Sequence, residues 1–134
     1  MAEGLVRHLI AYLDTHVLFW LCENRLDRLS VAARDALNQY DLLISPMVTI
    51  ELAYLHEIGR SRRVSRDIVK QLREQIGLRV CDHSFPDIAE TATFEAWTRD
   101  PFDRMIVAHA KANGYSPLVT ADEDIRANYP KAIW

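Results

Sequence analysis

Cysteine is scarce in this sequence of 134 residues: the only two, Cys22 and Cys81, each lie in an apolar run. They form no C-x-x-C pair, so the spacing typical of a zinc site is absent. A domain of this length hides roughly two-thirds of its unfolded surface and needs no disulfides to fold. We therefore expect both cysteines to be reduced thiols in the core, and the protein to work in a reducing, cytoplasmic compartment.

Long hydrophobic runs are also missing. A membrane-spanning helix needs roughly 20 apolar residues, whereas the longest apolar stretch here, around residues 9–22, is interrupted by Asp14, Thr15 and His16. Residues 1–8 lack the hydrophobic centre and the cleavage site of a signal peptide. The sequence therefore predicts no association with a membrane.

Positive charge is not in excess. The chain has 16 Lys and Arg residues against 19 Asp and Glu residues, which gives a formal net charge of −3. Proteins that coat nucleic acids are normally basic, so this balance argues against that class. It leaves room for an enzyme with an acidic metal site, because bound cations reverse the local charge.

Short apolar runs alternate with helical patterns along the chain. We expect strands at 9–13, 42–45, 78–81, 118–120 and 132–134. We expect helices at 16–23, 30–40, 48–58, 65–76, 86–97 and 101–113, with Ser30 and Ser65 as N-caps and Gly77 and Gly114 as stops. Such alternation predicts one α/β domain over residues 1–134, with a mainly parallel sheet of four to five strands between helices.

Two acidic residues follow predicted strands. Asp14 comes directly after the first strand, and Asp122 comes two residues after the run that ends at Thr120. In open α/β sheets, ligands bind at the carboxyl ends of the strands. We therefore expect Asp14 and Asp122 to lie at the same edge of the sheet.

Two further acids fall on the apolar faces of predicted helices. Glu51 is in register with Val48, Tyr54, Leu55 and Ile58, and Asp103 is in register with Ile106, Val107 and Ala110. A carboxylate that faces the core is unfavourable unless it has a partner. The pattern thus indicates that Glu51 and Asp103 each have a partner, which favours a functional role for both.

Each acid also has an ordinary structural interpretation. Asp14 could cap the helix that follows it, Asp122 could start a turn, and Asp103 could belong to a capping box. Asp100, directly before Pro101, has the pattern of an N-cap with proline at the first helical position, and we assign it to that role. The four remaining acids together favour a shared site more strongly than any one of them alone.

Crowded carboxylates repel one another, and a divalent cation would remove that repulsion. Ligands that are all oxygen suit Mg²⁺ or Mn²⁺ and suit Zn²⁺ poorly. Such ions activate water and orient a phosphodiester, so metal-assisted phosphodiester hydrolysis is the reaction class that these residues favour.

Four segments resemble those of PIN-domain proteins, and specifically of the VapC-type toxins of type II toxin–antitoxin pairs. They occur in the order and at the separations usual in that family, and they span nearly the whole chain. The segments are 12–16 (YLDTH), 45–52 (SPMVTIEL), 100–108 (DPFDRMIVA) and 118–122 (LVTAD).

The resemblance implies a PIN-like three-layer fold and a Mg²⁺- or Mn²⁺-dependent endoribonuclease that acts as a toxin. It implies an RNA substrate, a small antitoxin that covers the acidic groove, and a homodimer. It assigns Asp14, Glu51 and Asp103 as the core catalytic and metal-binding acids, Asp122 as a more variable fourth, and Thr15 and Thr120 as supporting residues.

The sequence departs from the family pattern at two places. Many close relatives have Trp before the second acid, where this chain has Ile50. Asp100 adds a carboxylate close to the third acid, and we prefer Asp103 because Asp-Arg begins the matching helical run.

Basic residues gather after the third predicted helix. They are candidates for binding RNA phosphates, although a solvated helix face or a surface for the antitoxin would have the same pattern. Arg104 could contact phosphate or pair with an acid such as Asp100. The candidates are Arg60, Arg62, Arg63, Arg66, Lys70 and Arg104.

Two other functions compete with the ribonuclease. A non-catalytic PIN-fold partner of RNA or antitoxin would keep the fold without turnover. A receiver-like signalling domain also gathers acids at strand ends, but it needs paired acids after the first strand, where this chain has Thr15 and His16. We therefore set the receiver-like domain aside.

Overall fold

The computed structural model describes residues 9–134 and contains a five-stranded sheet in the order β3-β2-β1-β4-β5. Every neighbouring pair of strands is parallel. The strands are β1 (Ile10–Leu13), β2 (Asp41–Ile44), β3 (Arg79–Val80), β4 (Leu118–Val119) and β5 (Ala132–Ile133). The predicted α/β class and parallel sheet are confirmed.

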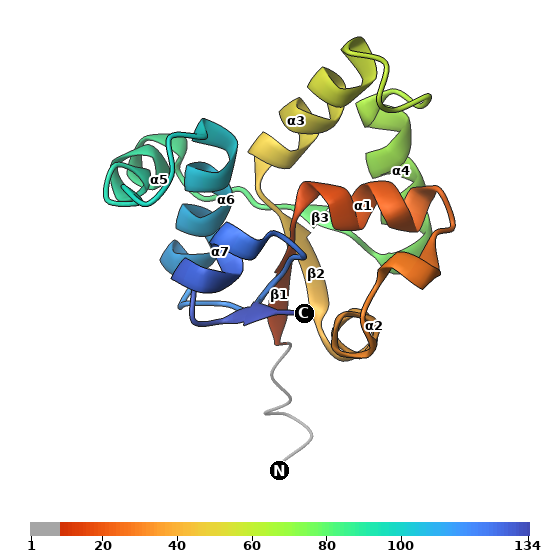
Figure 1. Cartoon of the computed structure of the whole chain (residues 1–134). Helices are drawn as coiled ribbons and strands as arrows, with labels where there is room; N and C mark the ends of the chain where they lie inside the picture. Colours follow the sequence, from red (N-terminus) through yellow and green to blue (C-terminus); the bar gives the residue numbers. More distant parts are fainter. Residues whose placement is uncertain (1–8) are drawn as a thin grey trace.

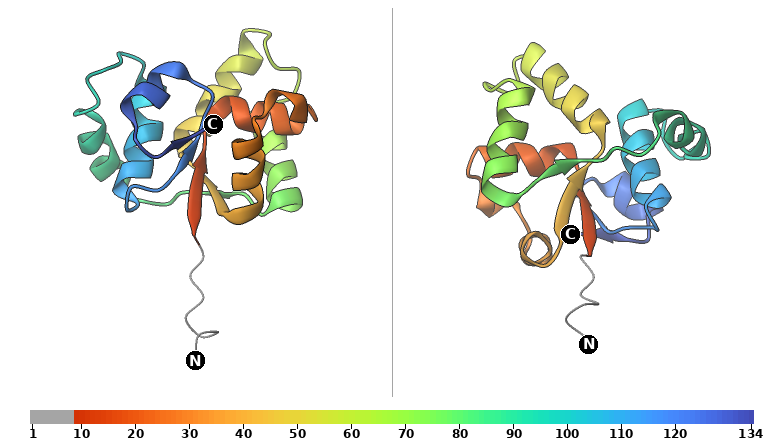
Figure 2. Two further views of the ribbon diagram at one scale, coloured as in Figure 1. Left: turned by 60° about the horizontal axis from the view of Figure 1, so that its bottom comes forward. Right: turned by 180° about the vertical axis from the view of Figure 1, so that it is seen from behind.

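Helices cover both faces of this sheet. They are α1 (Thr15–Cys22), the 3-10 helix η2 (Leu26–Arg28), α2 (Val31–Gln39), α3 (Pro46–Glu57), α4 (Ser65–Ile76), α5 (Phe85–Ala92), α6 (Pro101–Ala112) and α7 (Glu123–Asn128). Helices α1, α2 and α4 lie on one side of the sheet, and α5, α6 and α7 lie on the other (Figures 1 and 2). Helix α3 packs against α1, α4 and α6 beyond the carboxyl ends of the strands (Figure 1). The result is a three-layer α/β fold.

The predicted ends of several helices are confirmed by their caps. The Ser30 hydroxyl accepts a hydrogen bond from the Ala33 amide at 3.0 Å, and Gly77 ends α4 in the left-handed conformation at φ 69°. Ser65 does not cap α4: it is the first helical residue, and its hydroxyl donates to the Thr49 carbonyl at 2.6 Å instead. This bond ties α4 to α3.

Besides the short η2, which was not predicted, two α-helices differ from the sequence prediction. Helix α5 ends at Ala92 rather than near Trp97, because the chain turns at Thr93 and the Thr93 hydroxyl bonds back to the Glu90 carbonyl at 2.6 Å. Helix α7 was not predicted, since its six residues carry too few apolar positions for a helical pattern. Asp122 begins it, which becomes important for the site.

The core lies between the sheet and its two helical layers. Tyr12 is fully buried in β1, and its hydroxyl donates to the Cys81 sulfur at 3.1 Å. Both cysteines are free, as predicted, but only Cys81 is buried. Cys22 is half-buried and accepts a hydrogen bond from the Arg63 guanidinium at 2.8 Å. No helix within residues 9–134 is long and apolar enough to cross a membrane.

Helix α3 offers a test of this packing with an internal control. Leu52 is fully buried, whereas Ile50, two residues away, is 53% exposed. We expect Leu52→Ala to lower the free energy of unfolding by about 2–5 kcal/mol, because it removes buried methyl groups and leaves a cavity. Ile50→Ala should lower it by no more than about 0.5 kcal/mol. Urea unfolding of both variants checks this, and equal losses would contradict the placement of α3.

Candidate active site

Asp14 lies at the centre of the carboxyl edge of the sheet, directly after β1. The chain leaves β1 toward β2 on one side, and β4 lies on the other, so the direction of the connections reverses here. The Asp14 amide donates to the Val119 carbonyl at 3.0 Å, which extends the β1–β4 pairing by one residue. This register sets the Asp14 carboxylate beside Thr120, the residue that follows β4.

Thr120 links the two acids that follow strands. Its buried hydroxyl donates to Asp14 Oδ2 at 2.6 Å and accepts from the Asp122 amide at 3.0 Å. Asp14 Oδ1 accepts from the Thr15 amide at 2.8 Å, so both of its oxygens are held. Asp122 Oδ1 caps α7 by accepting from the Ile125 amide at 2.9 Å. The capping role considered for Asp14 is therefore confirmed, whereas Asp122, which was considered as the start of a turn, caps a helix instead. These caps fix both carboxylates at the predicted edge.

Glu51 reaches this edge from α3. The Thr15 hydroxyl donates a short hydrogen bond to Glu51 Oε1, which joins the start of α1 to α3. The expected apolar face of α3 is only partly correct. Val48 is buried, but Tyr54 and Ile58 are 50% and 47% exposed, because the end of α3 projects beyond the sheet. Glu51 itself is half-buried.

Asp103 reaches the same edge from the first turn of α6. Its predicted register is correct, since Ile106, Val107 and Ala110 are all fully buried. The rings of Phe102 on α6 and Tyr54 on α3 stack with centroids 6.5 Å apart. This contact holds together the two helices that carry Asp103 and Glu51.

Burial and the crowding of negative charges raise the proton affinity of three of these acids. Burial raises the pKa of Asp103 to about 8, and the negative charges of the four neighbouring acids add to the shift. Burial likewise raises the pKa of Glu51 to about 7, although the Thr15 hydroxyl opposes the change. The pKa of Asp14 is also raised by burial, against the hydrogen bonds from Thr120 and Thr15. These carboxylates therefore act on one another as a single electrostatic cluster.

Asp100 belongs to that cluster as well as to the helix cap. Its Oδ1 accepts from the amides of Phe102 at 2.8 Å and Asp103 at 3.3 Å, which confirms the predicted N-cap. Its charge is also the largest Coulombic contribution to the raised pKa of Asp103, and it raises that of Glu51. The sequence pattern identified the cap but missed this electrostatic role.

The donor set fits a hard divalent cation. In the part of the chain that the structure describes, no three His, Cys, Asp or Glu side chains are already arranged to hold a metal ion. The chemistry is nevertheless suitable, because the cluster offers carboxylate oxygens, which Mg²⁺ and Mn²⁺ prefer. No group within residues 9–134 donates a hydrogen bond to the Asp103 carboxylate, which leaves both of its oxygens free to bind a cation.

The basic candidates are spread over several surfaces. Arg60 and Arg62 are exposed and line a hollow with residues of α1. Arg66 and Lys70 are exposed on α4. Two side chains are engaged elsewhere: Arg63 donates to Gln71 and to Cys22, and Arg104 Nε donates to the Thr98 carbonyl at 2.8 Å instead of pairing with an acid.

Comparison with known families matches the PIN-domain model over residues 11–129. The chain belongs to the PIN-domain family. The match includes all four sequence segments that carry the resemblance, and it includes the acid cluster at the edge of the sheet. Comparison with curated protein sequences finds no match.

Solved structures share this PIN fold. A toxin–antitoxin complex from Klebsiella pneumoniae aligns with a TM-score of 0.64 at 21% identity, over 92% of this chain and 96% of that one. VapBC2 from Rickettsia felis, bound to a DNA fragment from its promoter, aligns at 0.60 and 18% identity over the same shares. DNA-bound VapBC from Salmonella typhimurium aligns at 0.57 and 21% identity, over 92% and 95%.

Burial and electrostatic crowding at Asp103 predict a pH-dependent loss of stability in the metal-free protein. Its pKa rises from 3.8 to about 8 on folding, so between these pH values the folded state binds more protons than the unfolded state. Stability therefore falls as the pH rises, and the full penalty applies above pH 8. We expect Asp103→Asn to stabilise the protein at pH 9 by about 1–2 kcal/mol, after allowance for solvent screening, and to change little at pH 4.

Asp35→Asn on α2 is the matched control, since it removes the same charge at an exposed position. We expect it to change the free energy of unfolding by less than about 0.5 kcal/mol at either pH. Thermal unfolding in EDTA measures both variants. Destabilisation by Asp103→Asn at pH 9 would contradict the crowding of this carboxylate.

Proposed function

We propose that this protein is a metal-dependent endoribonuclease of the VapC type and acts as the toxin of a toxin–antitoxin pair. One observation carries the proposal. Five carboxylates of a PIN fold gather at the edge of the sheet, where burial and the neighbouring negative charges raise the pKa of Asp103 to about 8 and that of Glu51 to about 7. A protein gains nothing in stability from such a cluster, so its value lies in the cation that it attracts.

Asp14, Glu51 and Asp103 are the proposed metal-binding and catalytic acids, with Asp122 as the fourth. Bound Mg²⁺ or Mn²⁺ would supply an activated water and stabilise the leaving oxygen of an RNA phosphodiester. Thr120 orients the Asp14 carboxylate, and Thr15 orients that of Glu51. At neutral pH Asp103 holds a proton in the metal-free protein and must release it when a cation binds.

The likeness of the fold to toxin–antitoxin complexes also supports a proposal about the partners of this chain. The aligned structures are of VapBC and other toxin–antitoxin complexes, which supports a small antitoxin as the partner of this chain. We propose further that residues 1–134 work as a single PIN domain, that the protein forms a homodimer, and that it acts in the cytoplasm. Arg60, Arg62, Arg66 and Lys70 remain the exposed candidates for binding RNA phosphates.

The proposed activity predicts that the purified protein cleaves structured RNAs with Mg²⁺ or Mn²⁺ and that EDTA stops the reaction. Asp14→Asn and Asp103→Asn should each lower the rate at least about a hundredfold, because each removes a negative charge that holds the cation. Asp35→Asn, the exposed control on α2, should cleave at the wild-type rate. Gel analysis of end-labelled RNA measures all four proteins.

Two outcomes would contradict the activity. Cleavage that survives EDTA or both active-site substitutions would show that another group, or a contaminant, performs the reaction. RNA binding without cleavage in either metal, by a folded protein, would favour the non-catalytic PIN-fold partner instead.

A further inference from the structure

A basic hollow of about 320 Å³ opens beside the carboxyl end of α1. Two stretches that are distant in the sequence form it: residues 19–28, which run from α1 through η2, and residues 59–62 in the loop between α3 and α4 (Figure 1 shows these elements). We call it the arginine pocket, and its basic and aromatic lining residues are Phe19, Trp20, Arg25, Arg28, Arg60 and Arg62.

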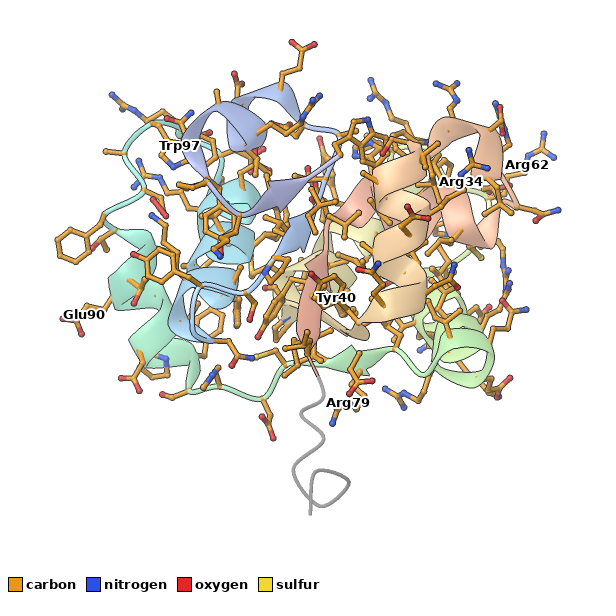
Figure 3. The ribbon with its side chains drawn as sticks, turned by 90° about the horizontal axis from the view of Figure 1, so that it is seen from below. Arg34, Tyr40, Arg62, Arg79, Glu90 and Trp97 are labelled. Atoms are coloured by element: carbon orange, nitrogen blue, oxygen red, sulfur yellow. The ribbon has the colours of Figure 1, made fainter. Side chains whose placement is uncertain are left out.

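Positive charge dominates this pocket although the whole chain has a formal net charge of −3. Four arginines face one acidic lining residue, Glu23. Arg25 is engaged in a two-point contact with Asp27, in which Nε lies 3.2 Å from Oδ1. Arg28, Arg60 and Arg62 are exposed, and Figure 3 shows Arg62 extending outward at the edge of the molecule. The pocket thus presents guanidinium groups that solvent can reach.

The loop that carries Arg60 and Arg62 is held in place by its backbone. Gly59 adopts φ 80°, a conformation that residues with a Cβ rarely adopt, and it turns the chain after α3. The Arg60 and Ser61 amides then both donate to the Leu55 carbonyl, at 2.8 Å and 3.2 Å. The Ser61 carbonyl is 2.9 Å from His56 Nδ1. The arginines therefore project from an anchored loop, so less order must be imposed when a ligand binds.

One face of α1 connects the pocket with the acid cluster. His16 lies in the first turn of α1, two residues after Asp14. A smaller hollow of about 110 Å³ lies between His16, Phe19, Leu55 and Arg60. It shares Phe19 and Arg60 with the arginine pocket. A linear polymer bound at Asp14 could therefore continue along α1 into the arginine pocket.

We propose that the arginine pocket binds the backbone of single-stranded RNA at nucleotides beyond the bond that is cleaved. Arg28, Arg60 and Arg62 would contact phosphates, because a guanidinium offers paired donors that match phosphate oxygens. The half-buried Phe19 ring gives a base a surface to stack on, while Trp20 packs against the rings of His16 and Trp134 beside it. The proposal rests on the proposed function for the identity of the ligand as RNA.

RNA fits this pocket better than an acidic peptide does. A peptide carboxylate would use the arginines alone, whereas RNA would also use the aromatic lining and the adjoining hollow that extends to His16. Near Asp14, Glu51 and Asp103 a polyanion is repelled unless cations are bound. Binding energy supplied by arginines at a distance from the cluster would hold the substrate while its reactive bond lies among carboxylates.

The test measures binding in EDTA, where a metal-dependent reaction cannot occur. The probe is a fluorescein-labelled single-stranded RNA of mixed sequence, and fluorescence anisotropy gives its Kd over a range of salt concentrations. The pocket variant is Arg28→Gln/Arg62→Gln. The control is Arg34→Gln/Arg79→Gln, which removes the same charge from exposed arginines that do not line the pocket (labelled with Arg62 in Figure 3).

We expect the pocket variant to raise the Kd about tenfold or more, and the control to change it less than about threefold. The slope of log K against log salt should fall by about 1.4 in the pocket variant, because each phosphate of a single strand that is neutralised by an arginine accounts for about 0.7 of that slope. Equal weakening by both variants would overturn the proposal, since it would reflect overall charge. No effect of either variant, or no binding of RNA by the wild type, would overturn it too.

An acidic peptide of Asp and Glu residues forms the second arm. If the pocket variant weakens binding of this peptide and leaves RNA binding unchanged, the pocket serves a protein partner and the proposal fails. The ribonuclease and the pocket can also fail separately. Cleavage with Mg²⁺ at unchanged KM in the pocket variant would reject the pocket alone, whereas pocket-dependent RNA binding without cleavage would reject the ribonuclease alone.

Discussion

Electrostatic repulsion acts among five carboxylates that the fold gathers at one edge of its sheet: Asp14, Glu51, Asp100, Asp103 and Asp122. Burial makes Asp14, Glu51 and Asp103 harder to ionise, and the negative charges around them add to the effect because water screens buried charges less. Asp103 accordingly holds its proton to about pH 8. The cluster destabilises the metal-free protein at high pH, and a bound divalent cation would relieve that cost. Stability and proposed activity thus oppose each other at the same atoms.

The remaining structure keeps these charges in place against their repulsion. The β1–β4 register sets Asp14 beside Thr120, whose hydroxyl also receives the Asp122 amide. Helix caps hold Asp100 and Asp122, since backbone amides favour a carboxylate at a helix start. The Tyr54–Phe102 stack joins the two helices that bring Glu51 and Asp103. For Asp100 and Asp122 the structural and functional interpretations therefore do not exclude each other, because each caps its helix through one carboxylate oxygen, Oδ1.

Sequence patterns predicted the parallel sheet and the position of Asp14 and Asp122 at its edge, because strand ends and sheet topology follow from local apolar runs. They failed where an effect depends on tertiary distance. Asp100 was assigned to a helix cap alone. The sequence pattern does not show that its charge also acts on the Asp103 carboxylate through space. The exposure of Tyr54 arises because α3 extends past the sheet, which helical periodicity does not describe. Arg28 and Arg60 are far apart in the sequence, and only the folded chain brings them to the same pocket.

The central claim is that the acid cluster shares a divalent cation. Crystals of the protein soaked in Mn²⁺ test it most directly, because anomalous scattering at the manganese edge locates the ion independently of any activity. We predict a peak bound by Asp14 and Asp103, with Glu51 or Asp122 beside it, and no such peak in crystals of Asp103→Asn. A well-ordered cluster with no peak, or a peak that persists unchanged in Asp103→Asn, would contradict the claim.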